Sequence, residues 1–406
     1  MPGTPPDGEP VPADGHLGAA ALDGLGSRPL GIYVHVPFCG SRCGYCDFNT
    51  YTAAELGPGV SRARYAQLAI AEVRLAARVL GAAAPPVSTV FFGGGTPTLL
   101  PAADLAAILR AIDAELGLAP DAEVTTEANP ESVDERVLAE LRAGGFTRIS
   151  LGMQSAVGHV LTVLDRRHSP GRPEQCVAWA RSAGFAHVSL DLIYGTPGES
   201  TQDWVASVRS AVAAGPDHIS AYSLIVEAGT RLAARVRRGE LAPPDDDAMA
   251  DRYLAADDML SAAGLNWYEI SNWAAGPDSA CRHNLLYWTG GDWWGIGPGA
   301  HSHVGGIRWW NVRHPAAYAS RIAAGGSPGQ AREILTAAER RTEQIMLTTR
   351  LASGCPAGAL GPAGLRAAAA AVADGLASAA DLAAGRVVLT RKGRLLADAV
   401  IRDLTD

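Results

Sequence analysis

The feature that most restricts the fold is a regular alternation of short apolar segments with longer amphipathic ones. Strands are predicted where a segment is brief, rich in β-branched or aromatic residues and bounded by Gly, Pro or Asn. Six segments have this character: residues 31–36, 87–92, 122–127, 147–152, 187–193 and 218–224. The stretches between them, such as 62–80, place apolar residues on one helical face. Strict alternation predicts a parallel sheet with right-handed crossovers. Periodicity leaves both an open doubly wound sheet and an incomplete (β/α) barrel open.

Unusual polar or glycine-rich chemistry follows five consecutive predicted strands. The segments concerned are 35–46, "GGGTPT" at 93–98, "EANP" at 127–130, "MQS" at 153–155 and the end of the fifth strand with Asp191. Any one of them is also compatible with an ordinary turn. In α/β barrels, however, active sites lie at the carboxyl ends of the strands. We therefore expect the functional site at this rim.

Composition narrows the class of protein. The chain has 406 residues, of which 48% are hydrophobic and 19% charged, and its net charge is −8. These values predict a globular protein with one large domain and smaller appendages, and they argue against broad contact with nucleic acid or anionic membrane. No run approaches the ~20 apolar residues of a membrane span. Six cysteines in so long a chain do not indicate a disulfide scaffold, so we expect a reducing, cytoplasmic location.

Changes in pattern along the chain predict four regions. Residues 1–28, rich in Pro, Gly and Asp, are expected to be a disordered tail. Residues 29–240 form the predicted barrel, and 241–330 a linker region that includes a helix at 245–264 and a strand at 266–271. Residues 331–406 are expected to form a smaller α+β C-terminal domain with a winged-helix-like end. Because the chain is acidic, we expect this domain to pack or contact a partner rather than bind DNA.

Three cysteines share one glycine-containing loop, with the spacing Cys39-x3-Cys43-x2-Cys46. A structural zinc site would require a fourth Cys or His, whereas the position for a further thiolate is occupied by Phe48. The three thiols are also unlike buried structural cysteines, because a flexible glycine loop packs poorly into a core. An iron–sulfur cluster normally takes four thiolates, so a cluster held by three keeps one open coordination position. The spacing thus indicates a metal with a vacancy for a substrate or cofactor.

The cysteine spacing, Tyr45 just before the last cysteine, and "GGGTP" after the second strand together resemble the radical S-adenosylmethionine (SAM) superfamily. That resemblance implies a [4Fe-4S] cluster on Cys39, Cys43 and Cys46 whose open iron binds SAM. It also implies a partial (β/α)6 barrel, which resolves the choice that periodicity leaves open.

Within that superfamily, "YVHVPFC", "FFGGGTPT", "SLGMQS" and "DLIYGTPGES" resemble the coproporphyrinogen III dehydrogenase branch, which includes haem chaperones. The resemblance implies SAM contacts at Tyr33, Tyr45, Gly94, Gly95, Thr96, Glu127, Gln154, Arg166 and Asp191. Glycines let a ligand approach the backbone, carboxylates accept from hydroxyls or an ammonium group, and a guanidinium pairs with a carboxylate. For Arg166 the alternative is a surface helix charge beside Arg167.

Two departures separate the members of this branch. The dehydrogenases carry a further cysteine where this chain has Phe48, and "HNLLYW" resembles the His-Asn-x-x-Tyr-Trp motif associated with haem in the chaperones. The resemblance implies haem contacts at His283, Asn284, Tyr287 and Trp288, with His283 as an axial ligand. A histidine among aromatic residues is otherwise a satisfied structural residue.

Three further residues of this region carry chemistry that the sequence does not assign. His301 and His303, in "GIGPGAHSHV", would line the cofactor cleft or provide a second axial ligand. Cys281 would attach or ligate haem, or be a buried thiol.

Three function classes remain. The preferred hypothesis is a chaperone that binds haem and transfers it to an unidentified acceptor protein while it holds a cluster and SAM. The alternative is an oxygen-independent coproporphyrinogen III dehydrogenase, and the third is a zinc-stabilised binding module. The sequence is compatible with a homodimer but does not predict the oligomeric state.

Overall fold

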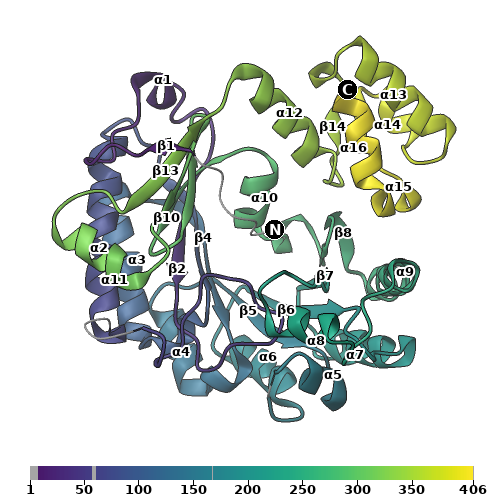
Figure 1. Ribbon diagram of the computed structural model, residues 1–406, viewed down its shortest axis with the longest axis horizontal. Coiled ribbons are helices and arrows are strands. Elements are labelled where there is room, and N and C mark those ends of the chain that lie inside the picture. Colours follow the sequence, from purple (N-terminus) through teal and green to yellow (C-terminus); the bar gives the residue numbers. More distant parts are fainter. Residues whose placement is uncertain (1–7, 57–60, 167, 406) are drawn as a thin grey trace.

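Six parallel strands form the centre of the fold, a curved sheet with helices along its outer face (Figure 1). The computed structural model describes residues 8–56, 61–166 and 168–405. The strands are β2 (Leu30–Val36), β3 (Val87–Gly94), β4 (Leu118–Ala128), β5 (Arg148–Gln154), β6 (His187–Tyr194) and β7 (His218–Ser223). The helices that connect them are α2 (Arg62–Leu80), α3 (Ala102–Leu116), α4 (Glu135–Ala143), α5 (Gly158–Val163), α6 (Arg172–Ser182) and α7 (Thr201–Ala213). All six predicted strands and the partial barrel are confirmed.

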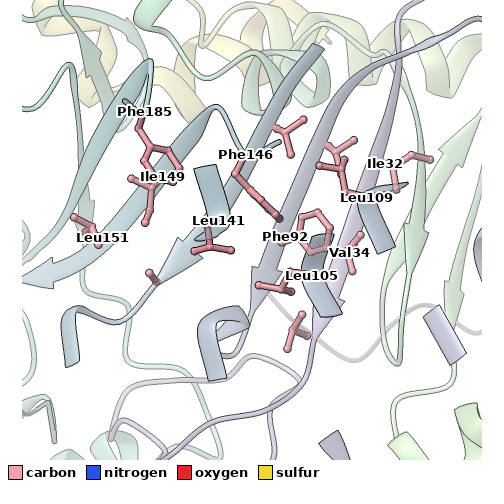
Figure 2. Packing of buried hydrophobic residues seen from close by; sticks show 14 of the residues in the cluster. Ile32, Val34, Phe92, Leu105, Leu109, Leu141, Phe146, Ile149, Leu151 and Phe185 are labelled. Atoms are coloured by element: carbon pink, nitrogen blue, oxygen red, sulfur yellow. The ribbon is translucent and has the colours of Figure 1, made fainter. Parts of the chain in front are cut away.

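The core lies between the sheet and its outer helices. Strand side chains alternate between the two faces of the sheet, so every second residue points at the helical layer. Figure 2 shows Val34 and Phe92 of the sheet packed with Leu105 and Leu109 of α3. Phe146, just before β5, is fully buried and stacks at a tilt on Phe92 at 5.1 Å. This packing fixes the strand ends, on which the site is built.

The sheet continues beyond both edges of the barrel, to thirteen strands within the described residues. On one side β10 (Asp292–Ile296) pairs in parallel with β2. The antiparallel strands β11 (His301–Val304), β12 (Ile307–Asn311) and β13 (Gly329–Ile334) follow. On the other side β9 (Asn272–Ala274) pairs with β7, and β8 (Asn266–Glu269) with β9.

The interpretation of 241–330 as a linker is therefore wrong, because its strands complete hydrogen bonding that the edges of the barrel would otherwise lack. Strand β13 also spans the boundary expected at residue 331. The helix and strand predicted within this region are confirmed by α9 (Asp246–Ala262) and β8. The other helices of this region are α10 (Arg282–Trp288) and α11 (Pro315–Ala323), and α8 (Arg231–Arg237) precedes it.

The N-terminal segment is packed from residue 8 onward. Strand β1 (Glu9–Pro10) pairs with β13, α1 (Ala19–Leu22) follows, and Leu17 and Ala21 are buried in the main core. The expectation of a disordered tail is wrong for residues 8–28, because the edge of β13 and an apolar surface are available to them. Residues 1–7 of that expectation lie outside the described residues.

The C-terminal unit has its own apolar core. It consists of α12 (Ala337–Thr348), β14 (Cys355–Pro356), α13 (Pro362–Ala373), α14 (Ala379–Ala383), β15 (Arg386–Val387), α15 (Arg391–Leu395) and α16 (Ala397–Thr405). Arg394 joins it to the rest of the chain through an ion pair with Asp257 of α9 (3.0 Å) and by lying over the Trp267 ring at 4.3 Å. In the described ranges, no helix is long and apolar enough to cross a membrane.

Candidate functional site

The cysteine loop begins where β2 ends and is held to its neighbours by backbone hydrogen bonds. The Cys39 amide donates to the Tyr51 carbonyl (3.0 Å), and the Gly44 amide to the Leu164 carbonyl (3.1 Å). All three thiols of the loop are free and partly exposed. Burial, together with the nearby Cys43 and Cys39, raises the pKa of Cys46 to about 11. The thiols thus lie close enough to disfavour each other's ionisation, a cost that binding to iron would remove.

The spread of these thiols bears on which metal they fit. Among the described residues, no group of three or more His, Cys, Asp or Glu side chains is arranged to hold one metal ion. A zinc ion draws all its ligands to one centre, whereas a [4Fe-4S] cluster offers a different iron to each thiolate. The geometry thus gives the zinc hypothesis no support, and the donor set fits a cluster.

Arg166 links the cysteine loop to the end of β5. Its guanidinium donates to the Cys43 sulfur (3.6 Å) and to the Gly152 carbonyl (3.1 Å), so it is not a surface helix charge. Gln154 (φ 65°) and Asp165 (φ 52°) both adopt the left-handed conformation that non-glycine residues avoid. Such conformations concentrate at functional sites, where the surroundings hold them in place.

The glycine run at the end of β3 packs tightly against the end of β2 and the cysteine loop. A Cβ on Gly95 would lie 2.4 Å from the Phe38 carbonyl oxygen, and one on Gly94 (φ 109°) would lie 2.6 Å from the His35 ring. The amide of Thr96, which is buried, donates to the same Phe38 carbonyl (2.7 Å). The glycines therefore allow β3 to pack closely against the loop. The sequence indicates only ligand access as the reason for these glycines, and it does not indicate this packing role.

Two half-buried carboxylates face the inside of the barrel. Glu127 accepts from the Gly94 amide (3.2 Å), and Asp191 accepts from the Ser150 hydroxyl (3.0 Å). Burial, then the charge of Asp191, raises the pKa of Glu127 to about 8. Burial also raises the pKa of Asp191. A cationic ligand between them would lower both pKa values, which suits the ammonium and sulfonium charges of SAM.

Two tyrosines predicted at this rim occupy different surroundings. Tyr33 donates to His35 Nδ1 (2.9 Å), while His35 Nε2 donates to the Asn49 carbonyl (2.9 Å). Tyr45 packs against a small apolar cluster that includes Val160 and lies outside the main core. His35 and Asn49 were not predicted. A polar residue inside a buried strand (His35) was the available signal for the first of them.

The HNLLYW motif lies on α10, against the amino-terminal half of the barrel strands. His283 is 1% exposed and hydrogen-bonds through Nδ1 with the Thr89 hydroxyl and through Nε2 with the Tyr287 hydroxyl, both at 2.8 Å. Asn284 donates to Glu269 (2.9 Å), and Trp288 is partly buried. The structure thus brings the cluster and SAM candidates together toward the carboxyl ends of the strands. The motif residues lie deeper in the barrel, where the His283 ring stacks on that of Tyr33 at 6.5 Å.

Comparison with known proteins agrees with this geometry. The family model for the Radical SAM superfamily matches residues 33–211, a range that includes the cysteine loop. Coproporphyrinogen III oxidase (HemN) from Escherichia coli has the same fold, with a TM-score of 0.80 at 22% identity over 97% of this chain and 94% of that one.

Curated relatives place the chain more narrowly. "Heme chaperone HemW" from Mycobacterium tuberculosis (strain ATCC 25618 / H37Rv) is 56% identical over 377 residues, 93% of this chain and 95% of the relative. The protein of the same name from Escherichia coli (strain K12) is 37% identical over 71% of this chain and 75% of its own length. The chain belongs to the HemW family of the radical SAM superfamily.

Proposed function

We propose that this protein is a haem chaperone, which binds haem and transfers it to an acceptor protein while it holds a [4Fe-4S] cluster and SAM. The observation that carries the proposal is the match over 93% of the chain to relatives named heme chaperone HemW. The free thiols support a reducing, cytoplasmic location. The acidic net charge supports a partner other than nucleic acid, and a homodimer stays a prediction.

The residues at the carboxyl ends of the strands suit the two resident cofactors. Cys39, Cys43 and Cys46 would hold the cluster, which supplies an electron to the sulfonium of SAM when both are bound. The backbone at Gly94 and Gly95, with the carboxylates of Glu127 and Asp191, would orient the polar end of SAM. Tyr33, Tyr45, Thr96, Gln154 and Arg166 complete the proposed contacts. Arg166 already contacts Cys43, so its charge would stabilise both the cluster thiolates and a bound carboxylate.

The alternative is oxidative decarboxylation of coproporphyrinogen III. The likeness to HemN is at 22% identity and shows the fold alone. Phe48, 60% exposed, stands where the dehydrogenase pattern has a further thiolate, which favours the chaperone. Incubation without oxygen with reductant, SAM and coproporphyrinogen III therefore gives no protoporphyrinogen. Product from protein with an intact cluster would replace the proposal by the enzyme.

The direct test is a titration of anaerobically reconstituted protein with ferric haem. We expect a saturable change in the Soret band at about one haem per chain, followed by transfer of that haem to apomyoglobin. A visible spectrum that is only the sum of free haem and the cluster would refute the chaperone function.

A further inference from the structure

Two histidine-containing segments are candidates for haem binding: HNLLYW, with His283, and HSHV, with His301 and His303. The structure gives them different surroundings. An axial ligand must offer a free ring nitrogen to the iron. Both nitrogens of His283 are engaged at 2.8 Å, and the ring stacks on Phe91 at 5.3 Å. Burial lowers its pKa to about 3. In this conformation His283 does not fit the role of axial ligand. Its buried side chain instead fills space in the base of the barrel.

The second segment, with His301 and His303, lies on the same inner surface of the sheet. It belongs to β11, which is separated from β2 by β10. A Cβ on Gly31 of β2 would lie 3.3 Å from the His283 ring, so Gly31 faces the inside of the barrel. Gly31 pairs with Trp293 of the neighbouring strand β10. Trp293 in turn pairs with His303 of β11. Paired residues share a face, and side chains alternate along a strand, so His301 and His303 both lie on this inner surface.

Only one of these two imidazoles is open to a ligand. His303 is buried, and its Nδ1 lies 3.0 Å from the Gly291 carbonyl oxygen. His301 is exposed, and within the described part of the chain its ring nitrogens make no hydrogen bond. Its ring stacks on Trp310 at 5.9 Å and 26°, and its carbonyl accepts from Trp293 Nε1 (3.1 Å). Partial desolvation by its surroundings, and then the charges of Arg313 and Arg308, lower the pKa of His301, which keeps the imidazole neutral and able to bind iron.

The surroundings of His301 also suit the propionates and the apolar ring of a haem. Arg313 is exposed and, across the described ranges, has no carboxylate within ion-pair distance, whereas Arg308 is paired with both Glu333 (2.9 Å) and Glu343 (2.5 Å). The Arg313 carbonyl accepts from Asn49 (2.8 Å), which ties this segment to the loop that follows the cysteines.

A further contact connects this place with the cysteine loop. A Cβ on Gly299 would lie 2.5 Å from the Asn49 side chain, so the turn before His301 packs on the same loop. The residue before Asn49 is Phe48, whose exposed ring provides apolar surface there.

We propose that His301 is the axial haem ligand, on the inner face of the sheet beside the cysteine loop, with Trp310 behind the imidazole and Arg313 available to a propionate. This inference rests on the proposed chaperone function and names its haem site. It assigns to His283 a structural role, and it places the haem beside the cysteine loop rather than in the base of the barrel.

The test is a ferric haem titration of the full-length protein with its cluster reconstituted. His301→Ala should weaken haem binding by about tenfold or more, a loss of about 1.4 kcal/mol, and remove the low-spin imidazole signature from the optical and electron paramagnetic resonance spectra. Added free imidazole should restore that signature. Arg313→Ala should weaken binding less and leave the signature unchanged.

A matched control removes another exposed imidazole near this surface. The His314 ring caps α11 by accepting from the Ala316 amide (3.2 Å), and Asn is an equally good cap. His314→Asn should therefore bind haem as the wild type does.

The outcomes separate this inference from the proposed function. A wild-type protein that binds no haem refutes the chaperone proposal itself. A wild type that binds while His301→Ala keeps both affinity and spectrum overturns the inference alone. So does a His283→Ala protein with native near-ultraviolet circular dichroism that has lost the imidazole signature.

Discussion

The two ends of the barrel are built from the same strands but in opposite ways. At the carboxyl ends lie three free, partly exposed thiols and two residues in the left-handed conformation. At the amino-terminal half, α10 takes part in a buried hydrogen-bonded network. In it, Glu123 accepts from the His283 amide (3.1 Å) and lies 3.7 Å from Arg148. The carboxyl end, the open end, has strained backbone and thiols that are free to bind a metal. The amino-terminal half, the closed end, is filled by buried, hydrogen-bonded side chains. The difference indicates that binding chemistry belongs to the first end and stability to the second.

The largest expected effect is loss of the cluster at the open end. Cys43→Ala removes one of three thiolates, and a cluster with two protein ligands is not retained. We expect iron and sulfide to fall to background after anaerobic reconstitution, with little change in the free energy of unfolding of the protein without its cluster. Cys176→Ala, which removes a buried thiol outside the loop, is the control and should keep full iron content. Normal iron in Cys43→Ala would break the contrast between the two ends.

The next effect is on stability, at the closed end. Glu123→Ala leaves Arg148, which is 1% exposed, as an uncompensated buried charge, at a cost of about 3–5 kcal/mol. Urea denaturation should show this loss in the free energy of unfolding. Asp121→Ala, two residues earlier, removes an exposed partner of Arg282 and should cost far less. Equal losses would mean that the network at the base does not stabilise the barrel.

The sequence predicts the open end better than the closed one, for a physical reason. Strands β2 to β7 and the cysteine loop follow from local periodicity and spacing, which short stretches carry by themselves. The environment of His283 depends on Thr89, 194 residues away, and no local pattern specifies that contact. The pairing of β10 with β2 and the packing of Leu17 are equally non-local, which is why the linker and tail expectations were wrong. A motif identifies which residues matter, but their partners decide what they do.

A third prediction uses the protonation of Glu127. Its pKa in the folded protein, about 8, lies above the ordinary value of 4.5, so the fold favours the protonated form. The resulting stability is complete below about pH 4.5 and is lost as the pH rises toward 8. Glu127→Gln stays neutral, so we expect it to be more stable than the wild type at pH 8, by about 1–3 kcal/mol.

The advantage of Glu127→Gln should shrink toward zero near pH 5. Urea denaturation of the protein without cofactors at both pH values measures it. A difference that does not depend on pH would show that the Glu127 carboxyl is not held protonated at the open end.

The smallest expected effect concerns strain at the open end. Asp165 is left-handed and approaches Gly44 so closely that a Cβ there would lie 2.6 Å from its carboxylate oxygen. Asp165→Gly removes the steric cost of this conformation and should raise the free energy of unfolding by about 0.5–1 kcal/mol. Asp251→Gly, the same replacement inside α9, should instead lower it by about 1 kcal/mol. If strain is what holds the rim ready for its ligands, Asp165→Gly will also bind SAM more weakly despite its greater stability. Gain in stability with unchanged SAM affinity would separate the strain from binding, and loss of stability would show that the contacts of the Asp165 side chain outweigh its backbone cost.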